Sequence, residues 1–245
     1  MRNIKLTIEY DGKDFNGWQK QPNRLNIQGE IERAIEIVTG ETVDLYASGR
    51  TDAGVHALGQ VANFQMENSM KLEKIPLALN SQLKKSIRIL SAEEVPLEFH
   101  SRYHCKKKTY CYHIYNGKYG TAIGRGFTYQ FPLELDVEKM QKATKYFVGE
   151  HDFKAFKASG TSSKSSVRTI YNLTVSKEGN LIKITVTGNG FLYNMVRIIS
   201  GTLVEVGLGK IAPEGVKDII AEGNRERAGK TLPAQGLFLV QVNYD

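Results

Sequence analysis

The sequence predicts an α+β protein built from two halves, each with its own strands and helices. Some short segments alternate apolar and polar residues, as half-buried strands do, and longer segments repeat apolar residues at helical spacing. The order of these elements in the first half returns in the second. With 245 residues, the chain is long enough for one large domain or two modest ones.

The first half begins with a strand. Apolar residues alternate over residues 4–10, and Asp11-Gly12 closes the run as a turn. Residues 27–38 follow as an amphipathic helix, with Asn26 as its N-cap and Gly40 as its stop. Strands are expected at residues 43–47 and 61–66, a weaker helix interrupted by Pro76 at 72–85, and a strand at 86–95. This is the split βαβ order of ferredoxin-like domains.

The second half repeats that order without repeating the sequence. We expect a strand at residues 109–115, a helix at 136–148, a hairpin at 168–188 that turns at "KEGN", a helix at 191–206, a short helix from Pro213 and a strand at 237–244. The prediction is therefore two ferredoxin-like halves, residues 1–104 and 105–245. Their mainly antiparallel sheets would be joined side by side, with helices on one face and a central cleft as the binding site.

Composition points to a polyanionic partner. The formal net charge is +7, and basic residues gather at 106–108, around the serine-rich stretch at 155–166 and at 224–230. Two cysteines are too few for a disulfide framework, which favours a reducing compartment. No apolar stretch approaches the roughly 18 residues of a membrane helix, and the N-terminus lacks a signal-peptide pattern, so we expect a cytoplasmic protein.

The segment "SGRTDAGVHALGQ" at residues 48–60 places one carboxylate, Asp52, between an arginine and two glycines. Aspartate often forms an Asx-turn or an N-cap in such a connection. Gly49 and Gly54 permit backbone that other residues avoid, and Arg50 brings a positive charge close to Asp52. The local sequence leaves both interpretations open: a turn residue, or a reactive group held out for a substrate.

Two cofactor patterns fail. "GNGFLY" at residues 188–193 has tyrosine where a dinucleotide fingerprint needs its third glycine, and no phosphate-binding loop motif occurs. His100, His104, Cys105, Cys111 and His113 lie close in sequence, and Cys111 and His113 would share one face of a strand. Their spacing matches no common zinc pattern, so a zinc-dependent nucleic-acid enzyme is only an alternative hypothesis.

Two further pairs of residues each allow a structural or a functional interpretation. Tyr110 and Tyr112 follow three lysines on the predicted strand, where the rings would either stack on an unstacked base or pack in the core. Asn194 and Arg197 lie off the apolar stripe of the helix at 191–206. Periodicity favours Arg197 as a surface residue, and pairing with a carboxylate from another element is the alternative.

At full length the sequence resembles the TruA family of tRNA pseudouridine synthases. "GRTDAGVHALGQ" resembles that family's catalytic motif. Further family blocks follow in order: "EYDGKDFNGWQKQ", "FHSRYHCKKKTYCYHIYN", "GNGFLYNMVRIISGTLVEVGLGK" and "AGKTLPAQGLFLVQVNY". Cys105 and the stretch Leu232-Pro233-Ala234 depart from the usual pattern without touching the inferred chemistry.

The resemblance implies isomerisation of uridine to pseudouridine at positions 38, 39 and 40 in the anticodon stem-loop of tRNA, by a homodimer that needs no cofactor. By motif match, Asp52 is the essential carboxylate and Tyr110 stacks on the target base. Arg50 assists near the flipped nucleotide, and Arg197, with Leu192 in the same block, pairs with the carboxylate. The basic residues expected to bind tRNA phosphates are Lys106, Lys107, Lys108, Lys164 and Arg168.

The chemistry suits this set of residues. Breaking the glycosidic bond, turning the uracil and rejoining it through C5 changes neither composition nor redox state. Asp52 would either attack C1′ of the ribose or remove the C2′ proton to give a glycal, and the sequence leaves both routes open. A non-catalytic RNA-binding module on the same fold is the alternative function.

Overall fold

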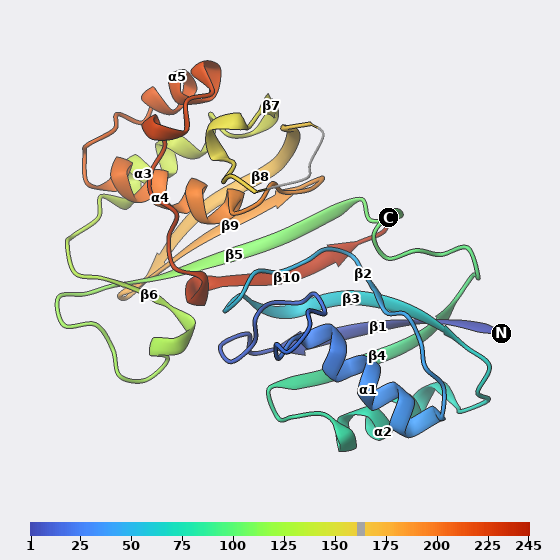
Figure 1. Ribbon diagram of the computed structural model, residues 1–245. Coiled ribbons are helices and arrows are strands. Elements are labelled where there is room, and N and C mark those ends of the chain that lie inside the picture. The colour runs from blue at the N-terminus through green and yellow to red at the C-terminus, as the bar shows by residue number, and fades with distance from the viewer. Residues whose placement is uncertain (161–164) are drawn as a thin grey trace. The chain divides into compact units, whose positions relative to one another are not determined.

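The computed structural model describes residues 1–160 and 165–245 of the chain. Its contacts group the chain into two compact units (Figure 1). The first contains Met1–Lys106 and Phe238–Asp245, and the second contains Lys107–Leu237. Each unit mixes helices with a mainly antiparallel sheet, so the predicted α+β class is confirmed.

The first unit has the ferredoxin-like arrangement of strands. Its elements are β1 (Arg2–Tyr10), α1 (Ile27–Thr39), β2 (Tyr46–Ala47), β3 (His56–Met66), the short η1 (Leu72–Lys74), α2 (Ile75–Gln82), β4 (Ile87–Val95) and β10 (Leu237–Asn243). The spatial order is β4-β1-β3-β2, and every neighbouring pair in it is antiparallel. β10 pairs in parallel with the start of β3.

Local sequence explains the first two elements of this unit. In β1 the alternating residues Ile4, Leu6 and Ile8 are fully buried. The Asn26 side chain caps α1 by accepting a hydrogen bond from the Gly29 amide at 2.8 Å. Gly40 ends the helix with φ of 78°, a left-handed conformation that glycine adopts without strain.

The second unit contains the longer strands. Its elements are β5 (Lys107–Asn116), η2 (Arg125–Phe127), β6 (Tyr129–Phe131), α3 (Val137–Thr144), β7 (Gly149–Asp152), η3 (Lys154–Phe156), β8 (Val167–Glu178), β9 (Leu181–Gly188), α4 (Met195–Gly207), α5 (Gly215–Glu222), η4 (Arg225–Arg227) and η5 (Ala234–Gly236). β9 lies between β5 and β8 and is antiparallel to both, while β7 extends the sheet beyond β8. Helices α3 and α4 lie side by side (Figure 1).

Among the element boundaries that differ from the sequence prediction, three concern segments that contain or adjoin the predicted site residues. β3 begins at His56 and so includes the second half of the glycine-rich motif. The strand expected at 43–47 is reduced to Tyr46–Ala47. The helix expected from residue 191 begins at Met195, because Asn194 has φ of 61° and cannot continue a right-handed helix. The division into domains at residue 104 stays a prediction.

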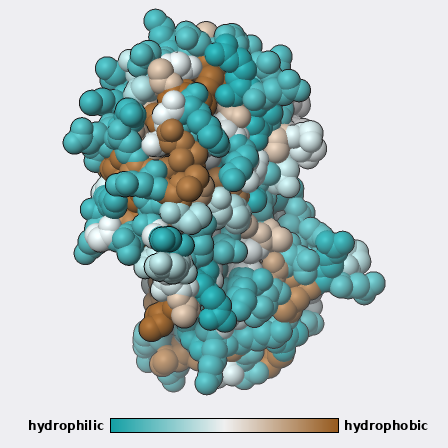
Figure 2. All heavy atoms as spheres, turned by 90° about the vertical axis from the view of Figure 1, so that its left-hand side faces the viewer, coloured by the Kyte–Doolittle hydropathy of each residue, from teal (hydrophilic) through white to brown (hydrophobic). Residues whose placement is uncertain are grey.

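The surface is mostly hydrophilic on the face shown in Figure 2, with hydrophobic residues gathered in a few patches. Within the described part of the chain, none of the helices has both the length and the apolar composition that a membrane span requires.

Candidate active site

The loop at residues 48–55 carries Asp52 immediately before the start of β3. Thr51 is buried, Asp52 is half-buried and Ala53 is exposed. The turn itself is made by the main chain, since the Val55 amide donates to the Asp52 carbonyl at 3.1 Å and Gly54 has φ of 77°. A strand follows the loop, so Asp52 is not a helix N-cap.

A second segment, residues 10–18, supports the Asp52 loop through hydrogen bonds to Thr51. The Trp18 amide donates to the Thr51 carbonyl at 3.0 Å, and the Tyr10 hydroxyl lies 2.7 Å from Thr51 Oγ1. Burial raises the pKa of the Tyr10 phenol, which therefore stays neutral. These contacts fix the backbone immediately before Asp52.

Glycine is required where the two loops touch. A Cβ at Gly12 would lie 2.0 Å from the Val55 carbonyl oxygen, and one at Gly17 would lie 2.7 Å from the Thr51 carbonyl oxygen. Gly17 also has φ of 88°. Both positions belong to the block "EYDGKDFNGWQKQ", so that block forms the support of the carboxylate loop.

The two ends of the motif are tied to each other. Ser48 Oγ lies 2.7 Å from Gln60 Oε1, and Gln60 Nε2 donates to the Gly49 carbonyl at 2.9 Å. The Val61 amide donates to the same Oε1 atom at 3.1 Å. Gln60 is fully buried, so it holds the loop closed from inside the unit.

His56 also belongs to the support. It is buried and its ring stacks on Phe238, with centroids 4.8 Å apart. Its Nδ1 lies 3.1 Å from both the Gly12 amide nitrogen and Asp11 Oδ1. One nitrogen cannot accept from the amide and donate to the carboxylate at once. We assign Nδ1 as the acceptor, because the Asp11 side chain is partly solvated and can find water instead.

Arg50, the other charged residue of the motif, is exposed on the loop. It makes none of the contacts that fix the loop backbone. Its predicted role beside the target nucleotide stays a prediction.

In the second unit, Tyr110 lies in a buried aromatic contact on β5. The Tyr110 ring meets the ring of Phe191 edge-on, with centroids 5.2 Å apart. Only 9% of Tyr110 is exposed. Leu192 is buried next to Phe191, and its amide donates to Met195 Sδ at 3.5 Å. Phe191 links the two predicted residues, because its ring contacts Tyr110 and Leu192 is the next residue in the chain.

Arg197 is half-buried, which corrects the surface position that periodicity favoured. Its Nε donates to the Leu232 carbonyl at 2.6 Å, and its Nη1 donates to Asn194 Oδ1 at 2.7 Å. The prediction failed because Leu232 is 35 residues away in sequence, and helix periodicity carries no information about such a partner. The guanidinium group is thus held in one orientation.

The segment that supplies the Leu232 carbonyl packs tightly on α4. A Cβ at Gly201 would lie 1.9 Å from the Lys230 carbonyl oxygen, and the Gly229 amide donates to Thr202 Oγ1 at 2.8 Å. Arg225 adds a hydrogen bond from Nη1 to the Gly229 carbonyl at 2.9 Å. Partial burial lowers the pKa of Arg225, in keeping with this structural role inside a basic run.

The basic residues predicted to bind phosphate differ in exposure. Lys106 and Lys107 are exposed, and Lys108 is half-buried. Arg168 is half-buried and donates to the Ser165 and Val167 carbonyls at 3.0 and 2.6 Å. Lys164 lies outside the described residues.

The zinc alternative gains no support. Cys111 is buried, accepts a hydrogen bond from Thr185 Oγ1 at 3.5 Å, and has a thiol pKa raised by burial. Among the residues that the structure describes, no three His, Cys, Asp or Glu side chains are grouped to hold a metal ion.

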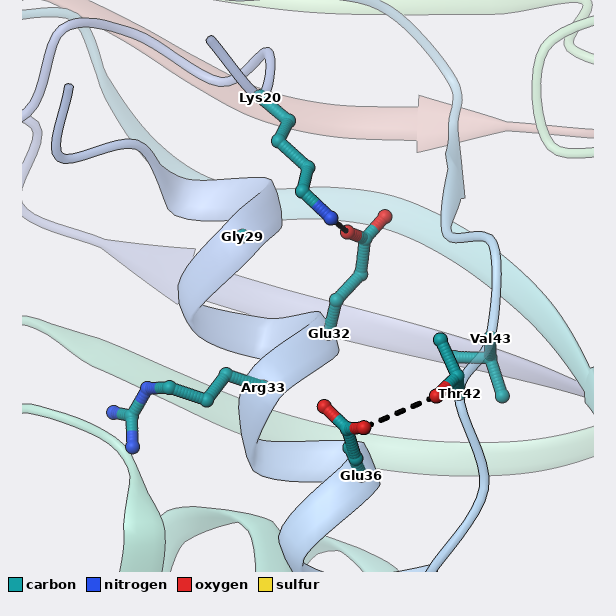
Figure 3. Close-up of a pocket in the computed structure, with 7 residues that line it drawn as sticks. All are labelled: Lys20, Gly29, Glu32, Arg33, Glu36, Thr42 and Val43. Carbon is teal, nitrogen blue, oxygen red and sulfur yellow. Dashed lines mark hydrogen bonds and ion pairs between the residues drawn. The ribbon is translucent and has the colours of Figure 1, made fainter. Parts of the chain in front are cut away.

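A surface pocket of about 250 Å³ lies beside α1 (Figure 3). Its polar groups largely satisfy one another: Lys20 pairs with Glu32 at 3.0 Å, and Thr42 donates to Glu36 at 3.0 Å. None of the predicted site residues lines it. It is therefore not our candidate site.

Comparison with known proteins tests the resemblance carried by the motif loop. A family model described as "tRNA pseudouridine synthase" matches residues 6–104 and 143–245, which include Asp52, Arg50, Leu192 and Arg197. The chain belongs to the tRNA pseudouridine synthase family. Among curated relatives, "tRNA pseudouridine synthase A" of Caldicellulosiruptor saccharolyticus is 54% identical over 100% of both chains. The proteins of the same name from Caldicellulosiruptor bescii and Acetivibrio thermocellus are 52% and 51% identical, again over 100% of both chains.

Several supporting residues of this family member escaped the sequence analysis, namely Tyr10, Gly12, Gly17, His56 and Gln60. The two glycines and the aromatic residues of "YDGKDFNGW" were visible in the sequence. Their partners were not, because the contact between residues 11–18 and 51–55 joins segments that are distant in the chain.

We expect Gly12→Ala to lower turnover at least tenfold. The added Cβ must separate the two loops at Val55, and displacements of about 1 Å near reacting groups can cost 100-fold in rate. Steady-state kinetics on unmodified tRNA, together with an RNA-binding measurement, provide the check. Gly126→Ala is the control, since a Cβ there meets no atom within 4 Å. Unchanged turnover in Gly12→Ala would contradict the support role.

We expect Gly201→Ala to lower the free energy of unfolding by about 1–3 kcal/mol, the usual cost of overpacking. The reason is the 1.9 Å approach of its Cβ to the Lys230 carbonyl oxygen. Urea unfolding measures the change, and Gly126→Ala should remain near the wild-type midpoint. Equal midpoints for both variants would show that the segment yields without cost.

Proposed function

We propose that this protein converts uridine to pseudouridine at positions 38, 39 and 40 in the anticodon stem-loop of tRNA, with Asp52 as the essential carboxylate. The observation that carries the proposal is the Asp52 loop, a carboxylate on a turn whose backbone is fixed from both sides. Membership of the family supports the reaction class. The fixed loop supports the choice of Asp52.

We also propose roles for Tyr110, Leu192, Arg50 and Arg197 in binding the target nucleotide and in pairing with the carboxylate. Taking a base out of its stack costs a few kcal/mol of free energy, and stacking that base on a tyrosine ring contributes about 1–3 kcal/mol in return. Tyr110 is proposed for this contact, with Leu192 beside it and Arg50 near the nucleotide. Arg197, fixed by Leu232 and Asn194, is proposed as the cation that pairs with the reacting carboxylate.

The remaining parts of the proposal come from the family resemblance and the composition. The enzyme would need no cofactor, since the isomerisation leaves redox state unchanged. It would act as a homodimer in the cytoplasm, where its tRNA substrate is found. Exposed Lys106 and Lys107 would contact tRNA phosphates with Lys108 and Arg168, giving salt-dependent affinity.

Asp52→Asn tests the central assignment. We expect at least a hundredfold loss of turnover with tRNA binding within a few-fold of wild type, because the amide keeps the shape and loses the carboxylate. Release of the C5 hydrogen from uridine gives the rate, and nucleoside analysis locates the product. Asp14→Asn, a change at an exposed aspartate of the supporting loop, is the control.

The outcomes separate the candidate functions. Wild-type protein that binds tRNA yet leaves every uridine unchanged would establish the non-catalytic RNA-binding module. Turnover by Asp52→Asn comparable to wild type would remove Asp52 from the mechanism, and product at positions other than 38, 39 and 40 would correct the target.

Deuterium at C2′ of the target uridine distinguishes the two routes for Asp52. Removal of the C2′ proton breaks that C–H bond, so the glycal route predicts a primary isotope effect on single-turnover rates. Attack at C1′ leaves the bond intact and predicts a rate close to that of the protiated RNA. The matched control carries deuterium at C5, so that the two positions are measured separately.

A further inference from the structure

Residues 96–106 connect β4 to the end of the first unit, and hydrogen bonds from buried side chains fix the path of this connector. Asn3 on β1 is buried, and its Nδ2 donates to the carbonyls of Pro96 and Phe99 at 3.0 and 2.9 Å. Since a buried amide without partners costs free energy, these bonds define the path of the connector.

Asn63 on β3 also holds the connector, through hydrogen bonds to Ser101. Its Oδ1 accepts hydrogen bonds from the Ser101 amide at 2.8 Å and the Ser101 hydroxyl at 2.7 Å, and its Nδ2 donates to Asn3 Oδ1 at 3.0 Å. The Tyr244 hydroxyl donates to the Ser101 carbonyl at 2.9 Å. The backbone on both sides of His100 is therefore anchored in the unit.

Outside this anchor lies a group of three rings and one cation, Tyr46, His100, Arg102 and Tyr103, which we call the aromatic cluster. His100 is half-buried and the other three side chains are exposed. The His100 ring centroid lies 5.1 Å from that of Tyr46 and 4.3 Å from that of Tyr103. The Arg102 guanidinium lies 5.9 Å from the centre of the Tyr103 ring. Tyr103 is 74% exposed and Tyr46 is 45% exposed. Large rings are thus held in solvent on an anchored backbone.

Hydrogen bonds fix the histidine tautomers of this region. His100 Nδ1 accepts from the Arg102 amide at 3.1 Å, and His104 Nδ1 accepts from the His100 amide at 3.2 Å. An accepting Nδ1 carries no proton, so these bonds assign the proton of each neutral ring to Nε2. The cluster therefore combines ring faces, an imidazole N–H donor and a guanidinium that pairs with no carboxylate in the described part of the chain.

This combination matches the chemistry of RNA. Aromatic faces accept unpaired bases, while guanidinium and N–H groups bind the phosphates between them. An apolar protein partner would leave Arg102 buried and unpaired, which is costly. The charge therefore favours an RNA strand over a protein surface.

The cluster belongs to the same unit as Asp52 but lies outside its immediate surroundings. Tyr46 pairs with Asn63 on β3, whereas the Asp52 loop ends at His56 on that strand. Seven residues at about 3.3 Å each separate the two positions by about 23 Å. Stacked nucleotides are about 3.4 Å apart, so the span corresponds to roughly six or seven nucleotides.

We propose that the aromatic cluster is a second RNA-binding site, which takes a base and its phosphate several nucleotides away from the target uridine. The proposal rests on the proposed function, because it takes the same tRNA as the ligand. It assigns to Tyr103 a stacking role and to Arg102 a phosphate contact, both remote from the reacting atoms.

Tyr103→Ala and Arg102→Gln test these roles. We expect Tyr103→Ala to weaken tRNA binding and raise KM roughly tenfold, within the range for a lost base–aromatic stack, with kcat within twofold of wild type. Tyr103→Phe should retain wild-type affinity, since the ring is kept. Arg102→Gln should lower the slope of log affinity against log salt by about 0.7–0.9, and Arg102→Lys should keep it.

Tyr119→Ala provides the matched control, because Tyr119 is 90% exposed with Lys118 near its ring but lies outside the cluster. Wild-type Kd, KM and salt slope in Tyr103→Ala and Arg102→Gln would overturn the second site while leaving the proposed function intact. A change in sedimentation without a change in RNA affinity would overturn it as well, because it would assign the cluster to contact between copies of the chain. Absence of pseudouridine with the wild-type protein would instead count against the proposed function.

Discussion

The close approach of two backbone segments, residues 11–18 and 51–55, is the constraint on which the candidate site depends. Only glycine fits at residue 12, where the Val55 carbonyl oxygen would lie 2.0 Å from a Cβ. At residue 17, φ of 88° adds a conformational reason to the steric one. Where the segments meet, the Thr51 carbonyl accepts a hydrogen bond from the Trp18 amide, and the Thr51 hydroxyl is hydrogen-bonded to the Tyr10 hydroxyl. Asp52 is then the residue that directly follows this fixed position, and its side chain is half-buried.

The second unit fixes its arginine by the same physical means. Gly201 on α4 admits the backbone at Lys230 to within a distance that no side chain would permit, and Arg225 ties down Gly229. Two residues after Lys230, the Leu232 carbonyl accepts a hydrogen bond from Arg197. In both units, glycine allows main-chain groups to approach: in the second unit the Leu232 carbonyl then orients the Arg197 guanidinium, and in the first unit the contacts fix the backbone that carries Asp52. Charged groups oriented before the substrate binds need no reorganisation during the reaction, which is the general advantage of such sites.

Sequence patterns predicted what depends on neighbours in the chain. The alternation in β1, the Asn26 cap of α1 and the Gly179 turn of the β8–β9 hairpin are all present, because each is decided within a few residues. The patterns failed where a distant partner decides. Periodicity placed Arg197 on the surface because it carries no information on the distant Leu232 carbonyl, and the left-handed backbone of Asn194 delays the start of α4 to Met195. Tyr10, His56 and Gln60 support the loop through contacts that cross the unit, which a single sequence does not encode locally.

The two interpretations of Asp52 that the local sequence left open are not exclusive. The turn at this position uses the Asp52 carbonyl and the Val55 amide, and its left-handed residue is Gly54. None of these atoms belongs to the Asp52 side chain, so this turn hydrogen bond would form equally well with asparagine or alanine at residue 52. That hydrogen bond therefore does not depend on a carboxylate at residue 52. Under the proposed function, the Asp52 side chain matters for the reaction of its carboxylate with the substrate, while the hydrogen bond of the turn depends on the main chain.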